Sequence, residues 1–289
     1  MKTINYLALL LLFFGAVACG YEETDPRQMD DSAAAQETAD GTDTEQDKDA
    51  EPQRTPIAEA GMTQLSGYLI DDLKSGTGTQ PIFDRLRNLD PEQLARTLDT
   101  DEKRLAFWIN VYNGTVQQRL TDDKTLWDDR KKFFSMPIVT VAGKELSLED
   151  IEHGIIRGSE TKLGMGYIGK LFPGEYEKMM RVKETDPRIH FALNCGAVDC
   201  PPVYSFNAAT IDKDLDQLTE AYLRRFSTYV PEKNIVRTTS LMKWFKGDFR
   251  EFDGVDDTLK KYGIVPEDAK DPDPEYTDYD WTLKLNNFG

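Results

Sequence analysis

The stretch DEKRLAFWINVYNGTVQQRLT, residues 101–121, decides the fold class more than any other part of the chain. Its apolar residues recur at helical spacing and form one broad stripe. The stripe consists of Leu105, Trp108, Ile109, Tyr112, Val116 and Leu120. Phe107 and Val111 lie on the opposite side. We therefore expect a long helix that is buried on two faces, with Asp101 as its N-cap.

Three amide side chains, those of Asn110, Asn113 and Gln117, occupy the boundary between the two apolar faces of this helix. An unsatisfied buried polar group costs about 1–3 kcal/mol, so each amide must be hydrogen-bonded. Two interpretations stay open. The amides either tie loops to the core, or they line a functional site.

The residues around this helix predict an α+β fold, a mostly helical single domain with a small antiparallel sheet. Alternation around Gly143 predicts a hairpin over 139–146. Ser147 and Asp150 resemble a capping box in front of a short helix that ends at Arg157. Further along the chain we expect a buried strand over 188–194, an amphipathic helix over 208–225, a strand over 234–239 and a helix over 241–252.

The short helix predicted over 147–157 carries two candidate site residues. Glu152 falls within the apolar arc of this helix, where a carboxylate must be paired or have a raised pKa. His153, one of only two histidines in the chain, lies on the flank, one turn from Arg157. The plain alternative is that His153 is a solvent-exposed surface residue.

The stretch IHFALNCGAVDCPP, residues 189–202, holds the other histidine, His190, and both cysteines outside the N-terminal segment. A disulfide between Cys195 and Cys200 is the first interpretation, because an exported protein meets an oxidising compartment. A thiolate nucleophile paired with His190 or His153 is the second. Zinc bound by two cysteines and two histidines is the third, although the spacings match no common zinc module. Two free, buried thiols are the remaining interpretation.

Residues 1–18 predict a secretory signal peptide. Lys2 supplies the positive charge, and the unbroken apolar run over 7–14 is too short for a membrane-spanning helix, which needs about 20 residues. The small residues over 16–18 fit ordinary cleavage. Cys19 directly after them resembles the acylated cysteine of bacterial lipoproteins, the interpretation that we favour. Gly20 at the next position favours the outer membrane over the inner one.

Residues 19–56 predict an acidic, disordered tether. Residues 20–56 contain twelve Asp or Glu and three Lys or Arg, a net charge of −9. Such a segment cannot bury enough apolar surface to offset its ordering entropy, and its like charges extend it. We therefore expect a globular domain over 57–289 that is held to the cell envelope by the membrane-inserted lipid of Cys19.

Several function classes are excluded or disfavoured. The net charge of −17 is too negative for binding to nucleic acid by neutralising phosphates. The glycines at 164, 166 and 169 match the dinucleotide-binding string, but a polar segment precedes them where a strand is required. The acidic residues over 212–216 imitate the start of a calcium loop, yet the glycine and the glutamate that such a loop requires are missing. We expect no nucleic-acid partner and no cofactor.

Three segments resemble the family called domain of unknown function 547. They are AFWINVYN (106–113), SLEDIEHGIIRG (147–158) and RIHFALNCGAVDCPP (188–202), with weaker echoes in MKWFKGDF (242–249) and YDWTLKLN (279–286). The family has no settled activity, so the resemblance implies no particular reaction. The segments that carry the resemblance contain the same polar residues that stand out from the apolar patterns described above. These residues are Asn110, Asn113, Glu152, His153, Arg157, His190, Cys195 and Cys200.

These observations predict a lipid-anchored envelope protein and leave its biochemical activity open. The first hypothesis is that its polar site serves thiol-dependent or acid–base catalysis. Cys195 or Cys200 is then the nucleophile and His190 or His153 the base. Glu152 or Asn110 is the orienting group. The alternative is a non-catalytic, disulfide-clipped module with a binding or structural role, in which the polar residues brace the interior.

Overall fold

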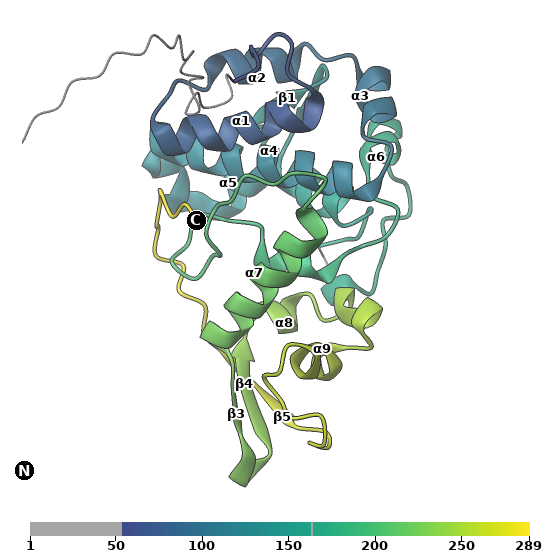
Figure 1. Ribbon diagram of the computed structural model, residues 1–289, viewed down its shortest axis with the longest axis vertical. Helices are drawn as coiled ribbons and strands as arrows, with labels where there is room; N and C mark the ends of the chain where they lie inside the picture. Colours follow the sequence, from purple (N-terminus) through teal and green to yellow (C-terminus); the bar gives the residue numbers. More distant parts are fainter. Residues whose placement is uncertain (1–53, 163) are drawn as a thin grey trace, which may run out of the picture. The chain divides into compact units, whose positions relative to one another are not determined.

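The structure is a computed structural model that describes residues 54–162 and 164–289 (Figure 1). The predicted signal peptide, Cys19 and the tether up to residue 53 lie outside the described residues. Within the described part of the chain, no helix combines the length and the apolar character that crossing a membrane requires.

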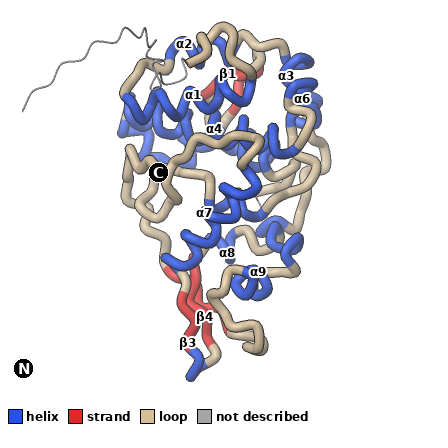
Figure 2. The backbone as a smooth tube through the Cα atoms, in the orientation of Figure 1, coloured by secondary structure: helices blue, strands red, loops and turns tan. Residues whose placement is uncertain are grey.

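Helices make up most of the regular structure, and the α+β class is confirmed (Figure 2). The α-helices are α1 (Met62–Ser75), α2 (Gln80–Arg87), α3 (Pro91–Thr97), α4 (Asp101–Asp122), α5 (Arg130–Ser135), α6 (Glu175–Met180), α7 (Ile211–Phe226), α8 (Leu241–Trp244) and α9 (Val255–Lys261). Shorter helical turns are η1 (Lys124–Asp129), η2 (Asp150–Ile156), η3 (Gly164–Gly166), η4 (Pro187–Phe191), η5 (Pro231–Lys233) and η6 (Asp248–Phe252).

The strands form two small sheets. β1 (Val139–Val141) and β2 (Lys144–Leu146) make an antiparallel hairpin. β3 (Thr228–Val230), β4 (Ile235–Thr239) and β5 (Asp273–Thr277) make a mixed sheet, in which β4 pairs antiparallel with β3 and parallel with β5. The predicted hairpin and the strand over 234–239 are thus confirmed, whereas the parallel pairing was not foreseen.

The long helix α4 lies at the centre of the larger of two apolar cores. Phe107 and Val111 on one side and the predicted stripe on the other are buried, so the expectation of a helix buried on two faces is confirmed. α1 packs along α4 (Figure 1). The N-cap is Thr100, whose hydroxyl accepts a hydrogen bond from the backbone N–H of Lys103 at 3.4 Å, and not Asp101 as predicted. Thr100 is extended, as an N-cap must be.

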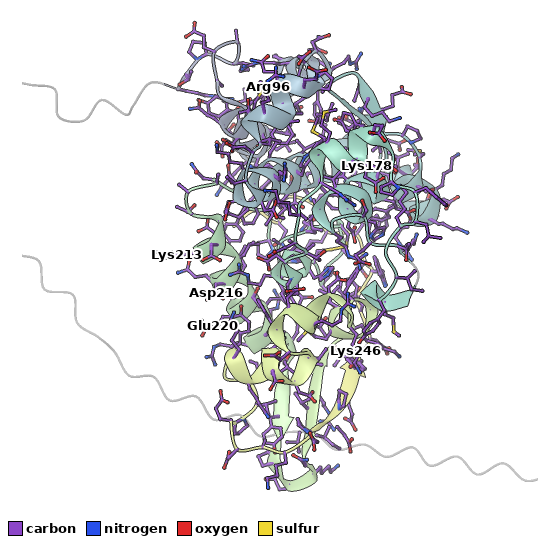
Figure 3. All side chains as sticks on the ribbon, turned by 90° about the vertical axis from the view of Figure 1, so that its right-hand side faces the viewer. Arg96, Lys178, Lys213, Asp216, Glu220 and Lys246 are labelled. Atoms are coloured by element: carbon purple, nitrogen blue, oxygen red, sulfur yellow. A yellow bond between two sulfur atoms is a disulfide. The ribbon has the colours of Figure 1, made fainter. Side chains whose placement is uncertain are left out.

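The predicted amphipathic helix corresponds to α7 and is confirmed. Its apolar residues, such as Leu215 and Leu223, are buried. The polar side chains of Lys213, Asp216 and Glu220 lie along its outer side (Figure 3). The second apolar core lies beneath α7, β4, α8 and α9.

The predicted strand over 188–194 is wrong, because the chain forms the 3₁₀ turn η4 there. Asp186 caps this turn by accepting a hydrogen bond from the backbone N–H of Arg188 at 2.9 Å, and Pro187 occupies its first position. An Asp-Pro pair is a helix-start signal. The alternation of His190 with apolar residues suggested a strand with one buried side. In the structure both sides of this segment are buried, so the alternation does not distinguish a strand from a helical turn.

The helix predicted over 241–252 is divided into α8 and η6 by the residues around Gly247. Gly247 packs directly on the backbone of Gly166: a Cβ atom at Gly247 would lie 2.4 Å from the carbonyl carbon of Gly166. The N–H of Gly247 donates to the carbonyl of Met165 at 2.6 Å. This close approach ends the helix and turns the next residue, Asp248, inward, where it is 3% exposed.

Candidate functional site

The segment predicted as a short helix over 147–157 contains a π-helical turn, η2. The capping box is confirmed: the N–H of Ser147 donates to Asp150 at 2.9 Å, and the N–H of Asp150 donates to the Ser147 hydroxyl at 3.0 Å. At the other end, the N–H of Arg157 donates to the carbonyl of Glu152, five residues back. Such wide turns occur often at functional sites. This one presents Glu152 and His153 from the same turn.

Arg157 and Asp248 form a buried, two-pronged ion pair. Nε and Nη2 of Arg157 lie 2.7 and 2.8 Å from the two carboxylate oxygens, and both side chains are 1% exposed. Burial favours the neutral carboxyl, but the hydrogen bonds from His190 and Arg157 outweigh it and lower the pKa of Asp248. Asp248 is therefore a carboxylate, and it can only accept hydrogen bonds.

His190 is held by the same carboxylate. Its Nε2 lies 2.8 Å from Oδ2 of Asp248, and its ring stacks on Phe245 with 3.7 Å between ring centroids. Burial lowers the pKa of His190, although Asp248 opposes that shift. A neutral imidazole that donates from Nε2 carries its lone pair on Nδ1. Nδ1 has no hydrogen-bond partner among the described residues.

His153 has the opposite arrangement of its ring nitrogens. Nη1 of Arg157 lies 2.9 Å from Nδ1 of His153, and an arginine can only donate. Burial lowers the pKa of His153, with Glu152 acting against the shift. The neutral ring therefore accepts at Nδ1 and carries its proton on Nε2. Both histidines are residues that the sequence singles out. Among the described residues, neither Nδ1 of His190 nor Nε2 of His153 has a hydrogen-bond partner, so one ring presents a lone pair and the other an N–H.

Glu152 lies beside His153, with Oε1 3.7 Å from His153 Nδ1. Its other oxygen accepts a hydrogen bond from the hydroxyl of Tyr112 at 3.1 Å. Burial and the charge of Glu152 raise the pKa of Tyr112 well above its usual value, so the phenol stays a donor. The sequence left two alternatives for this carboxylate, and the structure shows the first, a carboxylate with a hydrogen-bond partner.

A cavity of about 520 Å³ brings these groups together. Glu152, His153, His190 and Cys195 all line it, from segments that are far apart in the sequence. A concave site with a few convergent polar groups is the usual form of a small-molecule site. The structure thus brings four of the seven predicted catalytic residues into the lining of one cavity.

The remaining lining of the cavity is mostly apolar, with a large aromatic share, and its other charged residues are Arg130, Lys131 and the paired Lys162 and Glu149. Trp244, Tyr279 and Trp281 form a contiguous group, with centroid distances of 4.8–5.8 Å. The tryptophans are each 37% exposed. Arg130 lies over Trp281 at 5.4 Å, and neither Arg130 nor Lys131 has a carboxylate partner among the described residues. The cavity therefore offers an apolar surface beside unpaired positive charge.

Cys195 and Cys200 form a disulfide, the first of the interpretations left open by the sequence. Cys195 is half-buried and lines the cavity, whereas Cys200 is 2% exposed. The bonded sulfurs cannot serve as a thiolate nucleophile in this state. The zinc interpretation has no supporting geometry either: among residues 54–162 and 164–289, no cluster of three or more His, Cys, Asp or Glu side chains is arranged to hold a metal ion.

Asn110 and Asn113 lie away from the cavity wall. Asn110 Nδ2 donates to the carbonyl of Phe206 and its Oδ1 accepts from the Phe206 N–H, both at 2.9 Å. Asn113 does the same for the carbonyl of Ala192 and the N–H of Asn194, at 2.9 and 2.8 Å. Of the two interpretations, the amides follow the one in which they tie loops to α4.

Several site residues escaped the sequence interpretation. The pattern places Asp248 within a predicted helix and Tyr112 within the apolar stripe, and neither position indicates a site. Nothing in the local pattern distinguishes Tyr279, Trp281 and Trp244 from ordinary aromatic residues. The available signal was the pair of short segments near the C-terminal end, 242–249 and 279–286, which contain four of these five residues.

Comparison with known proteins adds little about activity. No curated protein and no solved structure matches the chain. A family model matches residues 95–223, a segment that includes α4, η2, His190 and the disulfide but ends before Asp248 and the aromatic group. The chain is therefore similar, over residues 95–223, to the family described as "Protein of unknown function, DUF547", and this match supports its assignment to that family.

Proposed function

We propose that the protein is a lipid-anchored acid–base catalyst of the cell envelope. The observation that carries the catalytic part is that His190 and His153 both line one cavity. Asp248 fixes the proton of His190 on Nε2, which leaves Nδ1 as a base. Arg157 fixes the lone pair of His153 on Nδ1, which leaves Nε2–H as a hydrogen-bond donor.

In this proposal the two histidines act on opposite ends of a reacting bond. His190 removes a proton from the attacking water or hydroxyl group and becomes the imidazolium, while the Nε2–H of the neutral His153 stabilises the departing atom by a hydrogen bond. His190 then returns its proton to the leaving group, and the charge of Glu152, which raises the pKa of His190, stabilises the imidazolium in between. Positioned general acids and bases contribute about 10²–10⁴-fold each. The disulfide excludes a thiolate nucleophile from this scheme while it is intact.

The lining of the cavity supports a class of substrate. Trp244 and Trp281 offer flat apolar surfaces, and Arg130 beside them offers a charge that no carboxylate neutralises among the described residues. A guanidinium binds carboxylates and phosphates in its plane. We infer a substrate that combines an apolar ring or chain with an anionic group.

The catalytic proposal is tested with 4-nitrophenyl esters and glycosides and with 4-nitroanilides, each in a neutral and an anionic form. The wild-type protein should release nitrophenol or nitroaniline faster from the anionic forms. His190→Gln should reduce the rate by at least about 100-fold. The matched control is Gln80→Ala, an exposed amide on α2. Equal rates in wild type and His190→Gln would contradict the proposal.

A second candidate is a non-catalytic structural module, and the amide bracing favours it. Asn110 and Asn113 each hold a loop to α4 with paired hydrogen bonds, as internal bracing requires. If none of the probes reacts faster than in buffer alone, this candidate replaces the first.

The envelope part of the proposal rests on the sequence of residues 1–56 alone. The mass of the mature protein, extracted from bacterial membranes with detergent, tests it. An acylated N-terminal Cys19 should be found, and Cys19→Ala should release the protein from the membrane fraction. An unmodified Cys19 in the membrane-derived protein would exclude a lipid anchor.

A further inference from the structure

The two sulfurs of the disulfide occupy unequal surroundings. Cys195 is half-buried and contributes to the cavity wall, where a dissolved molecule can reach it. Cys200 is 2% exposed and does not line the cavity. In thiol–disulfide exchange the attacking thiolate approaches one sulfur and the other leaves. Access therefore selects Cys195 as the attacked atom.

Three hydrogen-bond donors converge on the sulfur of Cys200. The backbone N–H groups of Cys195 and Ala197 donate to it at 3.1 and 3.3 Å, and the hydroxyl of Tyr279 donates at 3.3 Å. A disulfide sulfur is only a weak acceptor, whereas a thiolate is a strong one. The three hydrogen bonds therefore become stronger when the Cys200 sulfur becomes a thiolate.

The backbone between the cysteines is shaped to make this arrangement. Gly196 has φ +97°, a conformation that side-chain-bearing residues rarely adopt. The N–H groups on either side of it, those of Cys195 and Ala197, both donate to the Cys200 sulfur, whereas its own N–H donates to the side chain of Asn194 at 3.0 Å. A Cβ atom here would also lie 2.9 Å from Leu120. Hydrogen bonds to the C-terminal segment, such as Lys284 N–H to the carbonyl of Gly196 at 2.8 Å, hold the turn in place.

The third donor, Tyr279, is held by the same C-terminal segment. The N–H of Asp280 donates to the carboxylate of Asp199 at 2.7 Å, and the Tyr279 ring packs against Trp244 and Trp281. Burial and the neighbouring Tyr222 raise the pKa of Tyr279, so its hydroxyl keeps its proton.

We propose that Cys195–Cys200 is a redox-active disulfide that oxidises thiols entering the cavity, with Cys195 attacked and Cys200 leaving as a thiolate bound by three donors. A substrate thiolate bonds to the Cys195 sulfur, the Cys195–Cys200 bond breaks, and its electron pair stays on Cys200. A second substrate thiol attacks the mixed disulfide and releases Cys195. Two electrons and two protons pass from a dithiol, or two thiols, to the cysteine pair, and a small disulfide reverses the reaction.

The three hydrogen-bond donors around Cys200 also favour reduction of the disulfide over its formation. An interaction that stabilises the reduced form makes a disulfide a stronger oxidant. This activity does not depend on the acid–base proposal, because the electrons pass only between sulfurs. Loss of nitrophenol release in the assay above and loss of thiol exchange are therefore separate outcomes.

Exchange with glutathione tests which sulfur is attacked. The full-length protein is incubated with reduced and oxidised glutathione in graded ratios, quenched with acid, and analysed by peptide mass. The native protein should be partly reduced without denaturant, even where most of the glutathione is oxidised. Cys200→Ser should form a glutathione adduct on Cys195, whereas Cys195→Ser should leave Cys200 unmodified. A disulfide that is reduced only after denaturant is added, or an adduct on Cys200, would overturn the proposal.

Tyr279→Phe tests the thiolate-stabilising donor as a positioning residue. Loss of one hydrogen bond to the Cys200 anion should shift the equilibrium with glutathione about 5–10-fold towards the disulfide. Tyr276→Phe is the matched control, because the hydroxyl of Tyr276 on β5 has no hydrogen bond among the described residues. An unchanged equilibrium constant in Tyr279→Phe, or an equal shift in both variants, would contradict the assigned role.

Discussion

Arg157 donates two parallel hydrogen bonds to the carboxylate of Asp248, across 91 residues of sequence and with both side chains almost completely buried. This pair joins η2 to η6 and supports both histidines, since Asp248 binds His190 and Arg157 binds His153. The site thus depends on a single buried ion pair, and its energetics can be tested directly.

Asp248→Asn should destabilise the protein by about 3–5 kcal/mol. The change leaves the Arg157 charge buried without a counter-charge, which costs more than loss of a surface pair. The free energy of unfolding in urea measures the effect. Arg96→Met is the control: Arg96 pairs with Glu92 at 3.6 Å on the surface of α3 (Figure 3), and its loss should change stability by less than about 0.5 kcal/mol. Similar losses in the two variants would mean that the Arg157–Asp248 pair is not buried.

Stability should fall as the pH is lowered below about 6.5. Burial lowers the pKa of both His153 and His190 in the folded protein, so the unfolded chain binds protons first on acidification. The free energy of unfolding should then decrease by up to about 1.4 kcal/mol per pH unit for each histidine. Asp248 adds a further loss in more acidic solution, because its pKa is lowered in the folded state.

Urea unfolding between pH 7 and 5 tests this dependence. His190→Gln should be less stable than wild type at pH 7 but should show a shallower slope with pH. The same slope in wild type and in the double variant His153→Gln, His190→Gln would show that neither imidazole is responsible.

Asn113→Ala should lower the free energy of unfolding without any specific effect on probe hydrolysis per folded molecule. Removal of the amide leaves the Ala192 carbonyl and the Asn194 N–H without their partner, at a cost of about 1–3 kcal/mol for each group. Gln80→Ala, whose exposed amide bonds only to Asp84, should be close to neutral. A selective loss of activity in a fully stable Asn113→Ala protein would return Asn113 to the catalytic site.

Local signals explain which elements could be predicted. The apolar stripe of α4 and the Ser147–Asp150 box are each determined by residues within a few positions, and the structure contains both. The 188–194 segment failed because period-two alternation cannot distinguish a strand from a turn when both sides are buried.

Long-range contacts explain what the sequence could not reveal about the site. Asp248 faces inward only because the backbone of Gly247 meets that of Gly166, a contact between segments about 80 residues apart. The histidines and Glu152 were found because they are polar residues within apolar patterns. Tyr112 and Tyr279 resemble ordinary core aromatics in the sequence, and only their hydrogen bonds distinguish them.

The central claim is that Glu152, His153 and His190 form one buried site, and a proton NMR titration of the two histidines tests it most directly. The chain has only these two histidines, so the variants His153→Gln and His190→Gln assign each imidazole signal. Both imidazoles should titrate below the ordinary value of 6.5, because both are buried. Glu152→Gln should lower the midpoint of His153 further, since the carboxylate raises the pKa of that ring, and should affect His190 less. Two histidines that titrate near 6.5 and do not respond to Glu152→Gln would show that Glu152, His153 and His190 do not form one buried site.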